Sequence, residues 1–172
     1  MWQSGATLGA VQEPVSTGWA IPRVAVPALL LQTGGGKRQG EIYVMERVPQ
    51  HAGPETPLDM LNRPEGFFPF RPNDDGKAIL LVTKARTVAL TVRRTTTSED
   101  PDRISAARTG RLEITLADGS RLSGSATIEM PQHHSRLLDY LNASTDPFFA
   151  ITAADDVHLI NRAHVLYARP ED

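Results

Sequence analysis

The chain has 172 residues, of which 40% are hydrophobic and 22% are charged, and its formal net charge is −2 at pH 7. This composition is typical of a soluble globular protein, and the near-balanced charge gives no overall attraction to nucleic acid or to an anionic membrane. The chain has no cysteine, secretion signal or long apolar run, which excludes disulfides and thiolate sites and predicts a cytoplasmic protein without a membrane span.

Residues 1–26 are expected to form an N-terminal arm. The segment is rich in Gly, Ser, Gln, Pro and Thr, a composition that predicts a flexible tail. It also contains Trp2 and Trp19, and a tryptophan is costly to leave in water. The alternative is therefore a docking arm in which Trp2 and Trp19 contact a protein partner.

Residues 27–92 form the first predicted unit, which begins with two strands around a glycine-rich turn. The turn, GGGKR at 34–38, resembles a phosphate-binding loop only superficially. A P-loop requires Ser or Thr after the lysine and then a helix, whereas Arg38 and a predicted strand follow here. We therefore interpret GGGKR as a hairpin loop, followed by a short helix in LDMLN and three more strands.

Residues 93–109 are the predicted linker, and the second unit covers 110–172. RLEITLADG alternates apolar and polar residues, and Asp118-Gly119 is a strong hairpin signal. Gly124 lies inside the returning strand and marks a bend or bulge. SRLLDYLN predicts a short helix with Ser135 as its N-cap, and PFFAI, DVHLIN and HVLYA predict three further strands.

The two units repeat the same order of elements. LDMLNRPEGFFPF begins at Leu58 and LLDYLNASTDPFFAI at Leu137, and both have Leu-Asp-x-Leu-Asn before a Phe pair. The flanking strands and turns also match, which indicates a tandem duplication. The predicted fold is mainly β, with two tandem small bent β-barrels, each with one short helix, packed as a pseudo-symmetric pair.

The second unit resembles a known family in two motifs. GRLEITLADGSRLSG from Gly110 to Gly124 resembles the first motif of Sm-like proteins, and VHLINRAHVLYA from Val157 resembles the second, with Asn161-Arg162 in place of the usual Arg-Gly. The resemblance implies a five-stranded, SH3-like barrel, and many members bind RNA as rings. Where the family holds a base with Asp and Asn, this chain has IEMPQHH and a helix, which argues against RNA binding.

A set of polar residues recurs in both units and forms the structural signature of the repeat. The second unit is also similar to a group of uncharacterised bacterial domains with an Arg-x-x-Asp-x-Leu-Asn motif. The recurring residues are Asp59, Asn62 and Lys84 in the first unit and Asp139, Asn142 and Arg162 in the second. We expect each Asp to pair with the basic residue of its unit and so fix the helix to the sheet.

No arrangement of residues predicts catalysis, a cofactor or a metal. His133, His134, His158 and His164 are candidate zinc ligands by residue type alone. Adjacent histidines rarely face one ion, and the sequence has no H-E-x-x-H helix. Ser135 lies near histidines and Asp139 but not in a nucleophile elbow. We therefore expect a non-enzymatic protein with no cofactor, metal or small-molecule substrate.

The charge of each unit bears on nucleic-acid binding, which is the competing function. Residues 27–92 contain 8 Lys or Arg and 7 Asp or Glu, whereas 110–172 contain 5 and 9. An acidic unit without a basic stripe is a poor ligand for a polyanion. We therefore expect a non-catalytic interaction module, an accessory or structural subunit of a larger bacterial assembly. An Sm-like RNA-binding protein, contacting RNA through Lys84 and Arg162, is the alternative.

The paired phenylalanines predict which side chains are internal. Successive residues of a strand point to opposite faces, so Phe68 and Phe70 share one face, and Phe149 and Ile151 share the corresponding one. These four residues are expected to fill the two cores. Phe67 and Phe148 lie on the other face in each unit, and we expect them at a contact between the units or with a partner.

Overall fold

The computed structural model describes residues 22–49, 52–95, 108–128 and 137–171. Trp2, Trp19, His133, His134 and Ser135 lie outside these ranges, as does most of the predicted linker, and the predictions made for them stay predictions. The described residues are mainly β. The strands begin somewhat earlier than expected, at Arg23 instead of residue 27 in the first half and at Arg108 instead of residue 110 in the second.

The two halves have the same order of elements. The strands of the first half are β1 (Arg23–Gln32), β2 (Lys37–Met45), β3 (Phe67–Pro72), β4 (Leu80–Thr83) and β5 (Thr87–Arg93). Those of the second half are β6 (Arg108–Leu116), β7 (Arg121–Ile128), β8 (Phe148–Thr152), β9 (Asp156–Asn161) and β10 (Val165–Glu171). Helices α1 (Pro57–Asn62) and α3 (Leu137–Ala143) precede the third strands, and 3-10 turns η1 (Lys84–Arg86) and η3 (Arg162–His164) precede the fifth. Neither described helix has the length and apolar character needed to cross a membrane.

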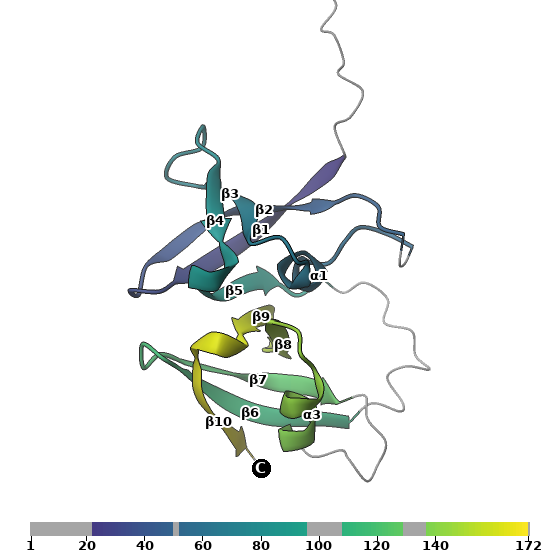
Figure 1. Ribbon diagram of the computed structural model, residues 1–172, viewed down its shortest axis with the longest axis vertical. Helices are drawn as coiled ribbons and strands as arrows, with labels where there is room; N and C mark the ends of the chain where they lie inside the picture. Colours follow the sequence, from purple (N-terminus) through teal and green to yellow (C-terminus); the bar gives the residue numbers. More distant parts are fainter. Residues whose placement is uncertain (1–21, 50–51, 96–107, 129–136, 172) are drawn as a thin grey trace, which may run out of the picture.

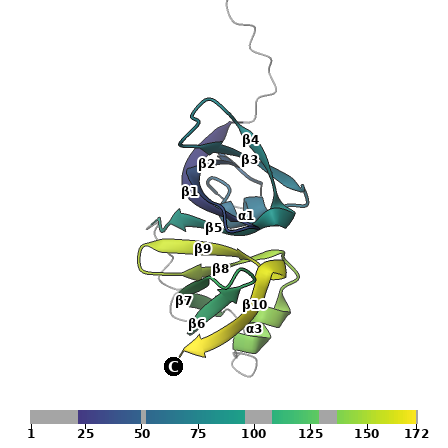
Figure 2. The same ribbon diagram turned by 90° about the vertical axis from the view of Figure 1, so that its left-hand side faces the viewer.

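The strands of the described residues form one open antiparallel sheet. Its ten strands lie in the order β10-β6-β7-β8-β9-β5-β1-β2-β3-β4. The halves therefore join edge to edge through β9 and β5, and β4 and β10 are the two outer strands. Figures 1 and 2 show β5 and β9 side by side in the middle of the molecule, with the strands of each half bent around their own interior.

Glycines allow the tight turns of the two leading hairpins. Gly34 and Gly35 have φ angles of 92° and 78°, and Gly119 has a φ of 84°, values that favour glycine. In the second hairpin, Oδ1 of Asp118 accepts a hydrogen bond of 3.0 Å from the Ser120 amide. Both hairpin predictions, GGGKR and Asp118-Gly119, are confirmed, because each turn connects two paired strands.

Two apolar clusters form the interior, and each includes residues of both halves. The first contains Phe68, Phe70, Met60 and Leu61 with Phe148 and Leu159 of the second half. The second contains Phe149 and Ile151 with Leu31, Val88 and Ala89 of the first half. The predicted strand phase is confirmed, because Phe68 and Phe70 are buried in one cluster and Phe149 and Ile151 in the other. The pairing of β9 with β5 brings the shared residues together.

Candidate interaction site

The junction between the halves is a continuous antiparallel ladder. Strands β5 and β9 pair from Ala89 opposite Ile160 to Arg93 opposite Asp156. Leu90 and Leu159 are directly opposite each other, and both are almost fully buried, with 0% and 2% of their surface exposed. Burial of apolar side chains is the main stabilising contribution to such a contact, so the ladder holds the halves as one unit.

Asn62, at the last position of α1, attaches the helix to the other half of the chain. Its side-chain oxygen accepts a 2.9 Å hydrogen bond from the Phe148 amide. Its side-chain nitrogen donates a 3.1 Å bond to the Phe148 carbonyl. Strand β7 pairs with β8 only at Ser125 opposite Thr152. At the Phe148 end of β8, the main-chain amide and carbonyl on the side facing β7 therefore bind the Asn62 side chain instead. A signature residue therefore contributes to the junction.

Further side chains bridge the ladder from β9 and η3. The buried Asn161 donates from Nδ2 to the carbonyl oxygens of Lys84 at 3.2 Å and Thr87 at 2.9 Å. Nε2 of His164 lies 2.8 Å from the carbonyl oxygen of Ala85, the residue that follows Lys84. These contacts hold η1 of the first half against η3 of the second, where otherwise main-chain carbonyls would be left unpaired.

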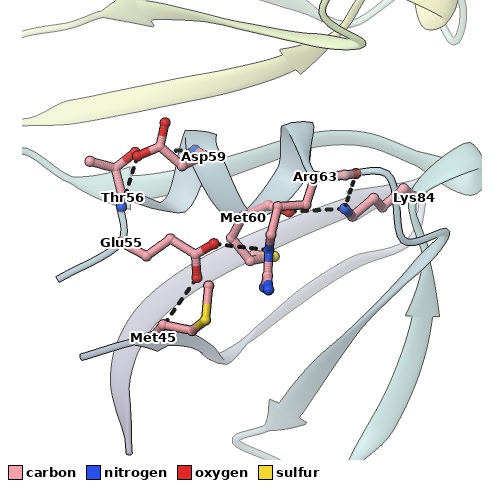
Figure 3. A network of polar contacts seen from close by, with 7 residues as sticks. All are labelled: Met45, Glu55, Thr56, Asp59, Met60, Arg63 and Lys84. Carbon is pink, nitrogen blue, oxygen red and sulfur yellow. Dashed lines mark hydrogen bonds and ion pairs between the residues drawn. The ribbon is translucent and has the colours of Figure 1, made fainter. Parts of the chain in front are cut away.

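Lys84 joins η1 to the C-terminal end of α1 (Figure 3). Its Nζ donates hydrogen bonds of 2.9 Å to the Met60 carbonyl and 2.8 Å to the Arg63 carbonyl. The last carbonyls of a helix lack partners within the helix and carry partial negative charge, so a cation is well placed there. Burial is the main cause that lowers the pKa of the Lys84 ammonium, and nearby Glu65 opposes this effect.

The start of α1 is fixed by a separate set of polar contacts, also shown in Figure 3. Thr56 and Asp59 form a capping box, with each side chain accepting from the amide of the other, at 3.1 and 3.2 Å. The preceding Glu55 is 3% exposed and accepts from the Met45 amide at 3.0 Å. Its other oxygen lies 2.9 Å from Nε of Arg63, so the buried carboxylate is paired.

Arg162 has the corresponding position in the second half. It donates from Nη1 to the Leu141 carbonyl in α3 at 2.6 Å, and from Nε to the Asp146 carbonyl at 2.8 Å. Its guanidinium lies 4.9 Å from the centre of the Phe149 ring, an arrangement that adds a cation–π contact. Like Lys84, Arg162 fixes the helix of its own half to the sheet.

The expectation that each signature Asp pairs with the basic residue of its unit is therefore wrong. Asp59 lies in the first turn of α1, where its carboxylate caps the helix, whereas Lys84 reaches the opposite end. Asp139 similarly lies in the first turn of α3, and Arg162 contacts the carbonyl of Leu141 further along. The basic residues do connect helix and sheet as expected, but through main-chain carbonyls, which no side-chain pattern in the sequence reveals.

The two outer edges of the sheet carry large apolar side chains that the described residues leave exposed. On the β4 side, Leu81 is 73% exposed and Phe67, in the neighbouring β3, is 62% exposed. On β10, Leu166 and Tyr167 are 64% and 53% exposed. Open edges of natural sheets are usually blunted by charge, proline or a covering element, so exposed apolar residues on both edges are unusual.

Phe67 and Phe148, the two phenylalanines predicted at a contact, differ in environment. Phe148 is 2% exposed and contributes to the first apolar cluster, so the other half of the same chain covers it. Phe67 occupies the corresponding position in β3 and is exposed. Sequence reasoning singled out both residues, but it missed Leu81, Leu166 and Tyr167, although Leu166 and Tyr167 lie in the predicted strand HVLYA. Alternation alone does not tell which strand is at an edge.

The described residues hold no group of three or more His, Asp or Glu side chains suited to a metal ion. His158 instead forms a 2.9 Å hydrogen bond through Nδ1 with Thr91 across the ladder, and burial lowers the pKa of its imidazole. No family model, curated protein or solved structure matches the chain.

Proposed function

We propose that the protein is a non-catalytic interaction module that serves as an accessory or structural subunit of a larger bacterial protein assembly in the cytoplasm. In this proposal its halves are tandem Sm-like, SH3-like bent barrels that arose by duplication. The shared order of elements supports this interpretation, as does the register of the third and fourth strands: Phe67 pairs with Thr83 as Phe148 pairs with Asn161. The absence of cysteine fits a reducing compartment.

The observation that carries the proposal is the apolar character of both outer strands. Strand β4 presents Leu81 and its neighbour β3 presents Phe67, while β10 presents Leu166 and Tyr167. An unpaired strand also offers a row of main-chain donors and acceptors, so another chain can add to the sheet through hydrogen bonds and apolar contact together. Protein binding at these edges is the function that the surface best supports.

The alternative of RNA binding finds less support in the same geometry. It relied on the cations of Lys84 and Arg162, and both are turned toward main-chain carbonyls of their own halves. Contact with a phosphate backbone would require these cations to leave their partners. The excess of acidic residues in 110–172 would in addition repel the phosphate groups of RNA.

The proposal predicts that a charge on an outer strand releases the protein from its assembly. Leu81→Lys places an ammonium on the β4 edge, where it opposes addition of a strand. In native extract the wild-type chain should sediment well above its own 18.8 kDa, and the variant should sediment as the free chain. Because Leu81 is exposed, the variant should unfold at the same urea concentration as the wild type.

The matched control is Gln39→Lys, which adds the same charge on the exposed face of β2, an inner strand of the sheet. It should leave the sedimentation of the assembly unchanged. A wild-type chain that sediments as a free monomer in native extract would contradict the proposal, as would an assembly that tolerates Leu81→Lys.

A further inference from the structure

We infer that a cavity where the two halves meet receives a lysine side chain of a partner protein. The inference rests on the proposed function, because it adds a further contact to the same interaction module. The cavity has a volume of about 390 Å³, within the range of ordinary ligand sites, which often lie between domains. None of its described lining residues belongs to the outer strands β4 and β10, so this contact is separate from the edges of the sheet.

Helix α1 has some of its side chains in the core and others at the cavity. Met60 and Leu61 are almost fully buried in the first apolar cluster. Leu58, Asp59 and Asn62 line the cavity instead, and Leu58 and Asn62 share one side of the helix because they are four residues apart. Figures 1 and 2 show α1 close to the second half, so the cavity has a wall from each half.

The apolar part of the lining comes from Met45 at the end of β2, from Val48 shortly after it and from Leu58. All three side chains are half-buried, and Leu58 also packs against the first apolar cluster. The four methylene groups of a lysine are apolar and pack well on such a surface while the ammonium group stays in a polar environment. This part of the cavity therefore suits the stem of a lysine side chain.

The polar part of the lining is mainly acidic. Among the described residues, Glu55, Asp59 and Asp146 contribute three carboxylates and Arg63 contributes one guanidinium, so the net charge is −2. Glu55 and Arg63 form the 2.9 Å ion pair shown in Figure 3 and largely neutralise each other. The remaining negative charge repels phosphate and other anions. An uncharged ligand would displace water from these carboxylates without replacing its hydrogen bonds.

Asp146 presents a carboxylate that is able to bind a cation directly. Its amide donates a 3.1 Å hydrogen bond to Oγ of Ser144, and its carbonyl accepts a 2.8 Å bond from Nε of Arg162. These main-chain contacts hold the residue in place ahead of β8. Its carboxylate is exposed and has no hydrogen bond or ion pair with another residue of the described ranges.

The arrangement of the three carboxylates favours an ammonium group on an aliphatic stem. Nowhere in the described ranges do three or more His, Asp or Glu side chains form a group suited to a metal ion, so a compact ion is a poor fit. A lysine ammonium has three donors that point in different directions, so it can bind Asp146 while the other carboxylates attract it from the first half. The planar fork of an arginine is instead matched to one carboxylate.

The site is accessible to a side chain that projects from another protein. Asp59 and Asp146 are both exposed, so the acidic groups lie where the cavity opens to solvent. A single ammonium group held mainly by one carboxylate binds weakly by itself. In a protein complex the same contact adds to apolar contacts elsewhere and selects a partner with a lysine at the matching position.

The first test measures binding of a small probe, Nα-acetyl-lysine N-methylamide, to the full chain. A probe of this size should bind with a Kd of about 1 mM. In a nitrogen-15 correlation spectrum, the amide signals of Leu58, Asp59 and Asp146 should shift until they saturate. The control probe is Nα-acetyl-norleucine N-methylamide, which has an apolar stem without an ammonium group and should shift these signals far less. Absence of saturation by the lysine probe at about 10 mM, tenfold above the expected Kd, would overturn the inference.

Asp146→Asn tests which group holds the ammonium. The substitution removes the charge at nearly constant size, and the affinity for the lysine probe should fall about tenfold. The urea midpoint should not change, because the carboxylate is exposed and has no partner among the described residues. Asp155→Asn is the matched control: it removes an exposed carboxylate of the same half outside the cavity and should leave the affinity unchanged. Equal affinity losses in the two variants would contradict the site.

A third experiment identifies the source of the ammonium group. Asp146→Lys places a cation at the cavity and should reduce the fraction of the chain that sediments with its assembly in native extract, whereas Asp155→Lys should not. If the probe binds and Asp146→Lys still sediments like the wild type, the natural ligand is a free amine and the inference of a partner lysine is wrong. Release by Leu81→Lys together with no binding of the probe would overturn this inference and leave the proposed function standing. A wild-type chain that sediments as a free monomer would contradict the proposed function even if the probe binds.

Discussion

Polar side chains at the junction act mainly on the main chain and seldom on one another. Asn62, Lys84, Asn161 and Arg162 all donate to carbonyl oxygens of turns, helix ends or strand ends. Such groups would otherwise be unpaired where the sheet bends and helices end. Of the residues that recur in both halves, Asn62, Lys84 and Arg162 therefore connect one element to another.

Asn62→Ala should destabilise the folded chain. The substitution leaves the Phe148 amide and carbonyl without the partners that they have at 2.9 and 3.1 Å. The expected loss is about 1–3 kcal/mol in the free energy of unfolding, the usual cost of unpaired buried polar groups. Urea denaturation followed by circular dichroism measures it.

The matched control for Asn62→Ala is Asn142→Ala in dilute protein. Asn142 has the corresponding place in α3 but is exposed, so its free energy of unfolding should change by less than about 0.5 kcal/mol. Equal losses for the two variants would show that the stabilisation comes from the helix end alone and not from the contact between halves.

At the scale of elements, the second strand of each half has a glycine where the third strand of that half packs closely against it. Gly40 of β2 pairs with Ala28 of β1 and with Pro72 of β3. A methyl group there would overlap the Arg71 carbonyl and lie 2.5 Å from Cζ of Phe70. The absent side chain therefore lets β3 and a core phenylalanine approach the strand closely.

Gly40→Ala should cost about 3 kcal/mol or more, because both the Arg71 main chain and the Phe70 ring would have to move. Gly124→Ala, at the corresponding place in β7, should cost less, since its methyl group would lie 2.9 Å from the nearest atom, the Thr152 carbonyl oxygen. Gly36→Ala is the control, with no atom within 4 Å of the added carbon. The decrease in the thermal unfolding temperature should be largest for Gly40→Ala, smaller for Gly124→Ala and smallest for Gly36→Ala. Any other order would contradict the close approach of strands inferred at these glycines.

At the scale of the whole molecule, the sequence predicts elements well and their assembly poorly. Alternation and turn residues correctly predicted both leading hairpins and the inward faces of Phe68 and Phe149, because these depend on neighbours in sequence. The pairing of β9 with β5 depends on segments far apart in the chain. The hydrogen bond between Asn62 and Phe148 spans 86 residues, and the sequence around either residue does not indicate that the other is its partner.

The different exposure of two equivalent phenylalanines likewise could not be predicted from the sequence. Phe67 and Phe148 occupy the same position in their halves, and no feature of the local sequence tells which is covered. The difference follows from the order of strands, which places β8 inside the sheet and β3 next to its edge. The two halves taken separately would have similar surfaces, and their joining into one sheet leaves one copy of each surface uncovered.

The stability of the junction should fall as the pH is lowered, through His158 of β9. Its imidazole is hydrogen-bonded to Thr91 of β5, and burial, only partly opposed by Asp156, lowers its pKa in the folded chain. The unfolded chain has the ordinary pKa of about 6.5 and takes up the proton first. The free energy of unfolding should therefore decrease as pH falls below that value, by at most about 1.4 kcal/mol per pH unit, until the folded chain also binds the proton.

The test compares the wild type with His158→Leu, which introduces the residue found at the corresponding place in β4, Leu80. Urea unfolding of dilute protein from pH 7.5 to about pH 5.5 should show a smaller loss of stability in the variant, because the other histidines are common to both chains and cancel in the difference. Equal slopes would mean that His158 titrates alike in the folded and unfolded chain. The ladder between β5 and β9, which joins the halves, would then be insensitive to acid.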